Sequence, residues 1–126
     1  MDIGDCFVNK PGRNTPSHLW IVLSDPNADP DNVLIVNLTD ADKHHDDSCI
    51  MTNADHAWLD KESVVAYQWS KITSVVDLAN IDGRGLLDHK HPLSSGALQR
   101  VLDGAYASDE LTGARRELLR RQGLID

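Results

Sequence analysis

His18-Leu-Trp-Ile-Val-Leu-Ser24 and Val33-Leu-Ile-Val-Asn-Leu-Thr39 are the two apolar runs that decide the fold of this chain. Both are short for helices, and both are rich in residues that favour β-strands. The segment between them, 25–32, holds two prolines and several Asp and Asn residues, which favour turns. The runs are therefore predicted to form an antiparallel pair of strands. That pairing places Ser24 and Thr39 near opposite ends, so these two hydroxyls need not share a site.

Further short apolar runs, separated by turn-forming residues, predict more strands. They lie at 4–9, 48–51, 63–67 and 71–76. This spacing is typical of a small, strongly curved β-barrel. After Gly83-Arg-Gly85 the apolar residues recur at helical spacing, which predicts two short helices near the end of the chain. The first should begin behind a cap at Ser94 or Ser95 and end near Gly104, because glycine favours the left-handed cap of a helix.

The length and composition indicate one ordinary globular domain. A chain of 126 residues can bury a single core, and no apolar stretch reaches the roughly 18 residues needed to cross a bilayer. The first residues lack the basic and apolar parts of a signal peptide, so a cytoplasmic protein is expected. In that compartment Cys6 and Cys49 are predicted to be reduced, buried thiols.

The net charge of −8 argues against a broad, sequence-independent grip on phosphate backbones, although a local site stays open. Residues 94–126 hold five acidic and five basic residues, and four of the basic ones are arginines within 114–121. They could form a solvated helix face whose stems cover apolar surface, or an electrostatic contact to RNA or an acidic partner.

Six histidines raise the question of a metal, centred on His44-His-Asp-Asp-Ser-Cys49. Neighbours in sequence usually cannot face one ion together, and no spaced pair of Cys or His accompanies them. We therefore expect no metal and no cofactor, and interpret this segment as a polar loop. The segment His89-Lys-His-Pro92 is likewise predicted to be an exposed loop.

His18 and His56 are the histidines best placed for chemistry. His18 precedes a buried strand, and His56 lies in a loop that Trp58 and Leu59 should anchor. A pair of histidines can act as base and acid when a ribose 2′-hydroxyl attacks the adjacent phosphate. A shared cleft is the geometry that such a pair needs; the alternative is that each ring only hydrogen-bonds loop backbone.

Cations and aromatic rings supply the other candidate contacts to a substrate. Arg13, Lys61 or Lys71 could stabilise the negative charge of the phosphorane. Exposed aromatic rings can stack on unpaired bases. Tyr67 and Trp69 are two residues apart and hence on one face of a strand, whereas core packing is the expected role of Trp20.

Four segments carry a resemblance to a known family: Gly4-Asp5 before an apolar strand, 19–24, 33–39 and Ser63-Val-Val-Ala-Tyr-Gln-Trp-Ser-Lys-Ile72. Through them, residues 3–76 resemble the PemK/MazF (Kid-like) toxin family. The typical members of this family are small SH3-like barrels that act as sequence-specific, metal-independent endoribonucleases and are paired with an antitoxin. The resemblance thus implies an SH3-like barrel over 3–76. Together with the length and the helical spacing described above, this predicts a mainly β fold in a single domain over 1–126, with a C-terminal pair of short helices over 94–122.

The function that the resemblance implies is a toxin-like endoribonuclease that cuts single-stranded RNA without a metal. His18 stands where the family usually places Arg-Pro, so histidines would replace chemistry centred on arginine. The expected catalytic residues are His18, Thr39, His56 and Lys71, and the expected substrate-binding residues are Arg13, Lys61, Tyr67 and Trp69. A non-catalytic binding module for a protein or nucleic acid is the main alternative, and a metal-dependent hydrolase built on the histidine-rich loops is a third. An antitoxin protein is an implied partner, and a homodimer is left open.

Overall fold

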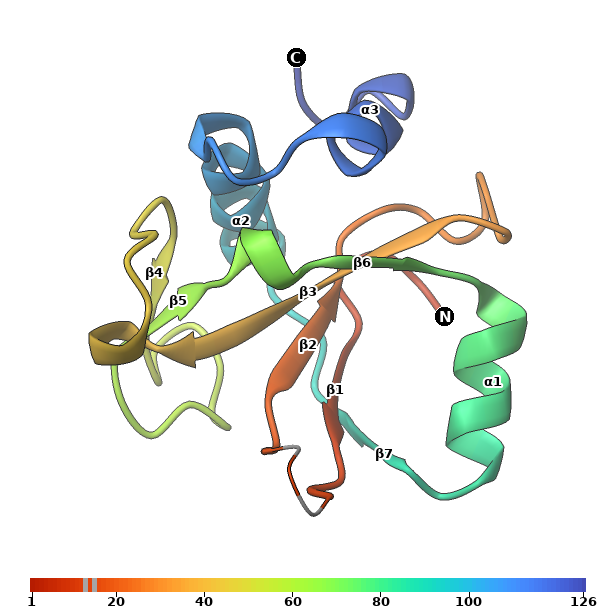
Figure 1. Ribbon diagram of the computed structural model, residues 1–126, viewed down its shortest axis with the longest axis horizontal. Coiled ribbons are helices and arrows are strands. Elements are labelled where there is room, and N and C mark those ends of the chain that lie inside the picture. Colours follow the sequence, from red (N-terminus) through yellow and green to blue (C-terminus); the bar gives the residue numbers. More distant parts are fainter. Residues whose placement is uncertain (13, 15) are drawn as a thin grey trace.

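The protein forms one antiparallel sheet with three helices, as the computed structural model shows for residues 1–12, 14 and 16–126 (Figure 1). The strands are β1 (Cys6–Asn9), β2 (Leu19–Val22), β3 (Val33–Asp40), β4 (Ile50–Met51), β5 (Ser63–Val65), β6 (Lys71–Thr73) and β7 (Leu87–Lys90). The helices are α1 (Val75–Gly83), α2 (Ser95–Ala107) and α3 (Gly113–Arg121), with 3₁₀ turns η1 (Ala41–Lys43) and η2 (Tyr67–Trp69). Within the described residues, none of the helices is both long and apolar enough to cross a membrane.

The sheet is open. Its strand order is β4-β5-β3-β2-β1-β7, and β6 also pairs with β3. The predicted pairing of the two apolar runs is confirmed, with Trp20 opposite Asn37. The mainly β expectation is confirmed in this coarse form, but no ladder joins β4 to β7 in the described part of the chain, so a closed barrel is not observed. The edge strand β4 has only two residues, too few main-chain groups to close the sheet.

The central strand β3 is paired along both edges. On one edge it pairs with β2, and on the other with β5 and then β6. Leu38 lies opposite Val65, and Ile35 lies opposite Lys71. The three positions from Leu38 back to Ile35 on β3 thus face a segment that advances six positions, from Val65 to Lys71. The extra residues of that segment form η2. The predicted strand over 63–67 is thus cut short and followed by a turn.

The two faces of the sheet pack against different helices. Side chains alternate between the faces along each strand, as the pleat requires. The core between one face and the helices α2 and α3 includes side chains of the sheet, of both helices and of the turn between them: Val8, Leu19, Ile21, Leu34, Val36, Leu38, Val101, Leu102, Leu111, Leu118 and Leu119. The opposite face carries a smaller cluster with α1, formed by Phe7, Val22, Val33, Ile35 and Leu78. Figure 1 shows α1 set apart from α2 and α3, in agreement with these two clusters.

Two predictions for the chain between residues 71 and 92 are wrong. The strand expected over 71–76 ends at Thr73, and α1 begins at Val75 because the Ser74 hydroxyl accepts the main-chain N–H of Asp77 at 3.1 Å. The segment 89–92 was expected to be a loop, yet its first two residues belong to β7. That strand pairs with β1, with His89 opposite Phe7.

The two C-terminal helices are confirmed, with one correction. The Ser94 hydroxyl caps α2 by accepting the main-chain N–H of Ala97 at 3.2 Å. However, α2 does not end at Gly104 but continues to Ala107. Instead, Gly104 is a site of close packing, since a Cβ there would lie 2.4 Å from Tyr67 Oη.

The predicted buried thiols are also present. Cys6 and Cys49 are free and buried. Burial raises the pKa of the Cys6 thiol to about 12, so it stays protonated at neutral pH. Burial raises the pKa of the Cys49 thiol as well, so neither thiol is activated as a thiolate.

Replacing Gly104 by alanine is expected to destabilise the protein. Its Cβ would also lie 2.7 Å from Cys49 Cβ, so the overpacked core should lose about 1–3 kcal/mol of unfolding free energy. Gly96 in the same helix has open space around it, and Gly96→Ala should be neutral or stabilising by up to about 1 kcal/mol. Urea denaturation of both variants measures the difference. Equal stability of the two variants would contradict the close packing at Gly104.

Candidate functional site

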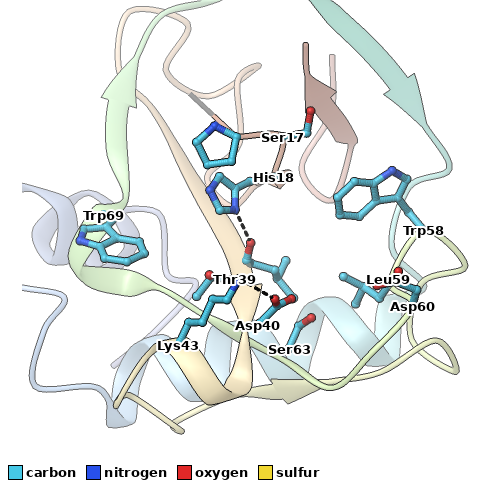
Figure 2. A pocket seen from close by; sticks show the side chains of 12 residues that line it. Ser17, His18, Thr39, Asp40, Lys43, Trp58, Leu59, Asp60, Ser63 and Trp69 are labelled. Carbon is cyan, nitrogen blue, oxygen red and sulfur yellow. Dashed lines mark hydrogen bonds and ion pairs between the residues drawn. The ribbon is translucent and has the colours of Figure 1, made fainter. Parts of the chain in front are cut away.

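A cavity of about 380 Å³ opens where β2 begins and β3 ends (Figure 2). We call it the His18 cavity. Among the residues that line it are His18, Thr39, Asp40, Lys43, Ser63, Trp58 and Trp69. It therefore combines a histidine, hydroxyls, charges and two tryptophans in one place.

The sheet register brings His18 and Thr39 together. Trp20 on β2 lies opposite Asn37 on β3. Two further steps of the same antiparallel register set His18 opposite Thr39, on the same face of the sheet. Two of the four predicted catalytic residues thus share the cavity, and the pairing of the two apolar runs is the reason.

One ring nitrogen of His18 is left for chemistry. Its Nδ1 lies 3.0 Å from the carbonyl oxygen of Leu38 (Figure 2). A carbonyl only accepts, so Nδ1 carries the hydrogen, and in the neutral ring Nε2 holds the lone pair. Nε2 forms no hydrogen bond with any described residue. The main-chain N–H of His18 donates to Asn9 Oδ1 at 2.9 Å, which holds the residue at the strand entry. His18 is therefore oriented to accept a proton through Nε2.

Two exposed tryptophans lie on opposite sides of His18 in Figure 2. Trp58 is 38% exposed and Trp69 is 46% exposed. Trp69 was predicted to bind substrate, whereas Trp58 was expected only to anchor its loop. A lone tryptophan among the polar residues of 53–60 is the signal that could have identified it. The pair offers two apolar surfaces for planar groups.

The charges of the cavity are nearly balanced. The Asp40 carboxylate lies 3.3 Å from Lys43 Nζ and 3.2 Å from Lys61 Nζ. The hydrogen bond from Lys61 is the main reason that the pKa of Asp40 lies below its usual value, and the pKa of Lys61 is raised in turn. Lys61, a predicted substrate contact, does not itself line the cavity, but its ammonium group is paired with Asp40, which does. A bound phosphate would compete with Asp40 for these two ammonium groups.

His56 does not share this cavity. It lines a second one, together with the segment 89–92, and of the residues that the structure describes only Trp58 lines both. Its Nδ1 accepts the main-chain N–H of Trp58 at 3.1 Å, and its Nε2 donates to the His91 carbonyl at 2.8 Å. Both nitrogens of this buried ring are thus occupied. The expectation of a shared histidine cleft is wrong, because His56 joins its own loop to the chain that follows β7.

His56→Ala is expected to lower the unfolding free energy by about 1–3 kcal/mol, because it leaves the Trp58 N–H and the His91 carbonyl without a partner. His89→Ala is the control, since His89 is exposed and Asp82 is the one hydrogen-bond partner of its ring among the described residues. Surface changes of that kind usually stay within about 0.5 kcal/mol. Urea denaturation compares the two, and a His56 variant as stable as the control would contradict the bridging role.

Tyr67 cannot bind substrate in this structure. It is fully buried, and its hydroxyl donates to the Val101 carbonyl at 2.6 Å. Burial raises the pKa of this phenol above its ordinary value. Because η2 is a turn and not a strand, Tyr67 points into the core while Trp69 faces solvent. The prediction that both share a strand face is wrong.

The remaining predicted contacts lie elsewhere or are not described. Lys71 is on β6, where its Nζ lies 5.3 Å from the centre of the Trp20 ring, and it does not line the His18 cavity. Trp20 packs against the smaller core cluster, as expected. Arg13 lies outside the described residues.

Two of the four C-terminal arginines bind main-chain carbonyls of the protein itself. Arg116 donates to Ala105 and Tyr106 at the end of α2, at 3.2 and 2.8 Å. Arg115 donates to the carbonyls of Tyr67 and Gln68 in η2, at 3.0 and 3.1 Å. These two side chains therefore hold η2 and the end of α2 in place. They neither form a solvated helix face nor point to an RNA contact.

The sequence matches no family model, and comparisons with curated proteins and with solved structures found no significant match.

Proposed function

We propose that this protein is an endoribonuclease of the PemK/MazF type that cleaves single-stranded RNA at the His18 cavity. The observation that carries the proposal is His18 itself. Its Nε2 has no partner among the described residues, and it shares a cavity with Thr39 between two exposed tryptophans. In fold terms, we propose an opened form of the SH3-like barrel. The support is the continuous course of β5, η2 and β6 along one edge of β3.

The proposed reaction is attack of a ribose 2′-oxygen on the adjacent phosphorus. His18 Nε2 takes the proton of the 2′-hydroxyl as the new P–O bond forms. The bond from phosphorus to the 5′-oxygen breaks, and that oxygen takes up a proton as it leaves. The products are a 2′,3′-cyclic phosphate and a 5′-hydroxyl, so no water or metal enters this step.

Thr39 and the lysines have supporting roles in this proposal. The Thr39 hydroxyl can donate to a non-bridging phosphate oxygen, next to the histidine that faces the ribose. Lys43 or Lys61 can move from Asp40 to the phosphate and stabilise the additional negative charge of the phosphorane. Asp40 thus keeps the two cations in place while no substrate is bound.

The substrate class follows from the tryptophans and the charge. Trp58 and Trp69 can stack only on bases that are not paired, which favours a single strand. A chain with a net charge of −8 cannot follow a long phosphate backbone, so a short segment of RNA is expected to bind. A cytoplasmic location, an antitoxin partner and a homodimer belong to the same proposal.

A non-catalytic binding module is the second candidate, and the position of His56 favours it. With His56 in another cavity, His18 is the one histidine among the described residues that line the His18 cavity. A general acid for the leaving 5′-oxygen would then have to be a lysine or solvent. The same cavity could bind RNA and leave it intact.

Cleavage of a short single-stranded RNA in the presence of chelator distinguishes these candidates. The wild type should give 2′,3′-cyclic phosphate ends, and His18→Ala should lose about 10²–10⁴-fold in rate, as expected for loss of a general base. His89→Ala should keep the full rate, because His89 lies outside the cavity. An RNA with 2′-O-methyl groups should stay intact. Cleavage by the wild type at the rate of His18→Ala would exclude the enzyme and leave the binding module.

Trp69→Ala is expected to weaken binding of the uncleavable 2′-O-methyl RNA by about 1–3 kcal/mol, the value of one stacked base. Tyr106→Ala is the control, because Tyr106 is an exposed aromatic residue on α2 outside the cavity. Fluorescence anisotropy of labelled RNA measures both. Equal affinities for the two variants would show that RNA does not use the His18 cavity.

A further inference from the structure

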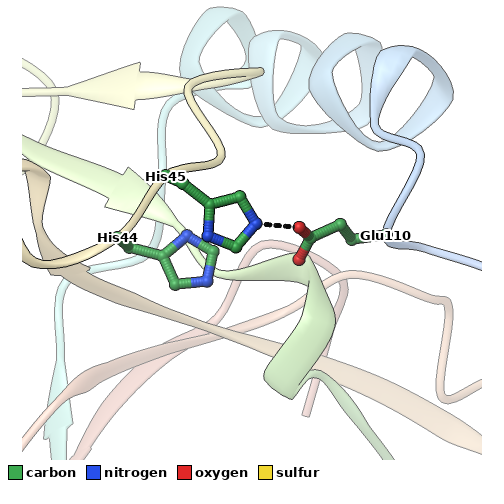
Figure 3. Close-up of side chains that lie close together, drawn as sticks. All are labelled: His44, His45 and Glu110. Carbon is green, nitrogen blue, oxygen red and sulfur yellow. Dashed lines mark hydrogen bonds and ion pairs between the residues drawn. The ribbon is translucent and has the colours of Figure 1, made fainter.

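Three potential metal ligands converge outside the His18 cavity (Figure 3). His44, His45 and Glu110 each offer one ligand atom, and these atoms lie within 4.8 Å of one another. The two imidazole rings are stacked, with centres 4.6 Å apart. His45 Nε2 contacts Glu110 Oε1. Residues 65 positions apart in the chain are thus brought to one point.

Two atoms of this cluster are buried without a partner. They are His44 Nε2 and Glu110 Oε2, and neither forms a hydrogen bond with a described residue. Buried polar atoms nearly always have a partner, because desolvation without one costs about 1–3 kcal/mol. A buried nitrogen and a buried oxygen left unpaired within one small cluster indicate a group that binds between them.

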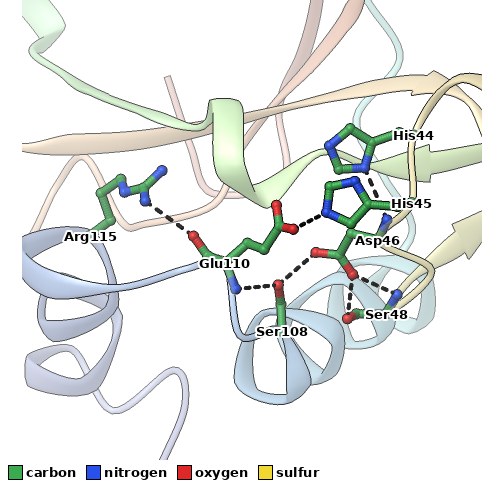
Figure 4. A network of polar contacts seen from close by, with 7 residues as sticks. All are labelled: His44, His45, Asp46, Ser48, Ser108, Glu110 and Arg115. Carbon is green, nitrogen blue, oxygen red and sulfur yellow. Dashed lines mark hydrogen bonds and ion pairs between the residues drawn. The ribbon is translucent and has the colours of Figure 1, made fainter.

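A hydrogen-bond network holds the cluster in place (Figure 4). The main-chain N–H of Glu110 donates to Ser108 Oγ at 3.1 Å, and that hydroxyl donates to Asp46 Oδ2 at 2.6 Å. Asp46 Oδ1 accepts the Ser48 hydroxyl, also at 2.6 Å. The loop that carries the histidines is therefore tied to the turn that carries Glu110. Such supporting bonds are typical of a preorganised site.

We propose that His44, His45 and Glu110 bind a divalent transition metal, with Zn²⁺ as the best match. Two imidazoles and one carboxylate are the ligand types that Zn²⁺ takes, whereas Mg²⁺ and Ca²⁺ prefer oxygen ligands. Three protein ligands leave a fourth position for water. This inference replaces the expectation that neighbouring histidines cannot face one ion, since His44 and His45 each offer a ring nitrogen within 4.8 Å of a Glu110 carboxylate oxygen.

Metal binding requires local changes at His44 and at the His45–Glu110 contact, because an ion between His45 Nε2 and Glu110 Oε1 replaces the hydrogen bond that joins them. Its Nδ1 accepts the main-chain N–H of Asp46 at 3.1 Å, so in the free protein the ring proton is on Nε2. Ligation through Nε2 moves the ring proton to Nδ1, which can then no longer accept the main-chain N–H of Asp46, so this hydrogen bond is lost. One such bond is worth about 1 kcal/mol, a small fraction of a typical zinc-binding energy.

The site borders the His18 cavity without belonging to it. The His44 ring contacts the edge of Trp69, with ring centres 4.8 Å apart, and Trp69 lines the cavity. A metal at this site would hold the loop against one wall of the cavity. The inference does not depend on RNA cleavage, because none of the three ligands lines the cavity.

Calorimetric titration of the full chain with Zn²⁺, after removal of bound metal by chelator, tests the proposal. The wild type should bind one Zn²⁺ per chain. His45→Ala and Glu110→Gln should each weaken binding by at least about tenfold, the lower range seen even for outer contacts of metal sites. His89→Ala is the matched control, because His89 and Asp82 form another exposed histidine–carboxylate pair, 2.9 Å apart, that lies outside the cluster.

Thermal unfolding provides a second readout that does not depend on activity. Zn²⁺ should raise the melting temperature of the wild type and of His89→Ala, and should leave those of His45→Ala and Glu110→Gln unchanged. Melts in chelator show whether each variant folds, and either ligand variant alone suffices for the comparison. Absence of Zn²⁺ binding by the wild type, or equal loss of affinity in His89→Ala, would overturn the proposal.

Discussion

The pairing of β3 on both edges is the constraint on which the rest of the structure depends. Seven of its eight residues are buried, and alternate side chains enter two separate clusters. The strand can bury both faces only because α2 and α3 cover one of them and α1 covers part of the other. The length of β3 also allows β5 and β6 to share one edge, with η2 between them. The His18 cavity lies at the end of this strand, where helix cover stops and polar side chains begin.

His18 and His56 differ in whether their second ring nitrogen has a hydrogen-bond partner. Each ring has one nitrogen that donates to a main-chain carbonyl. In His56 the other nitrogen accepts a main-chain N–H from its own loop, so neither ring nitrogen is free to bind another group. In His18 the corresponding nitrogen has no partner among the described residues and lies in a cavity with hydroxyls and cations. The difference comes from the neighbours, not from the residue type.

The sequence predicted the features that arise from local patterns. The β2–β3 pair, the Ser94 cap and the two C-terminal helices follow from runs of strand or helix formers and from turn residues. The start of α1 was missed because Val75 and Val76 favour strands, although Ser74 and Asp77 have the spacing of a helix cap. The fates of Tyr67 and Trp69 depended on the register shift at η2, which no local pattern reveals.

The candidate sites were harder to predict because their residues meet through long-range packing. His18 and Thr39 could be placed together once the register was known, so the sequence came close to this site. His56 meets the carbonyl of His91, 35 positions away, and His45 meets Glu110 across 65 positions. Such contacts depend on how the loops pack against β7 and the α2–α3 turn.

The hydrogen bonds from Arg115 to η2 connect α3 to one wall of the His18 cavity. Its guanidinium donates to the carbonyls of Tyr67 and Gln68 before Trp69 and to the Ser70 carbonyl after it, although Arg115 itself does not line the cavity. A side chain of α3 thus holds the turn that presents Trp69 from outside the cavity lining. A substitution at Arg115 would therefore loosen one wall of the cavity while every lining residue stayed the same.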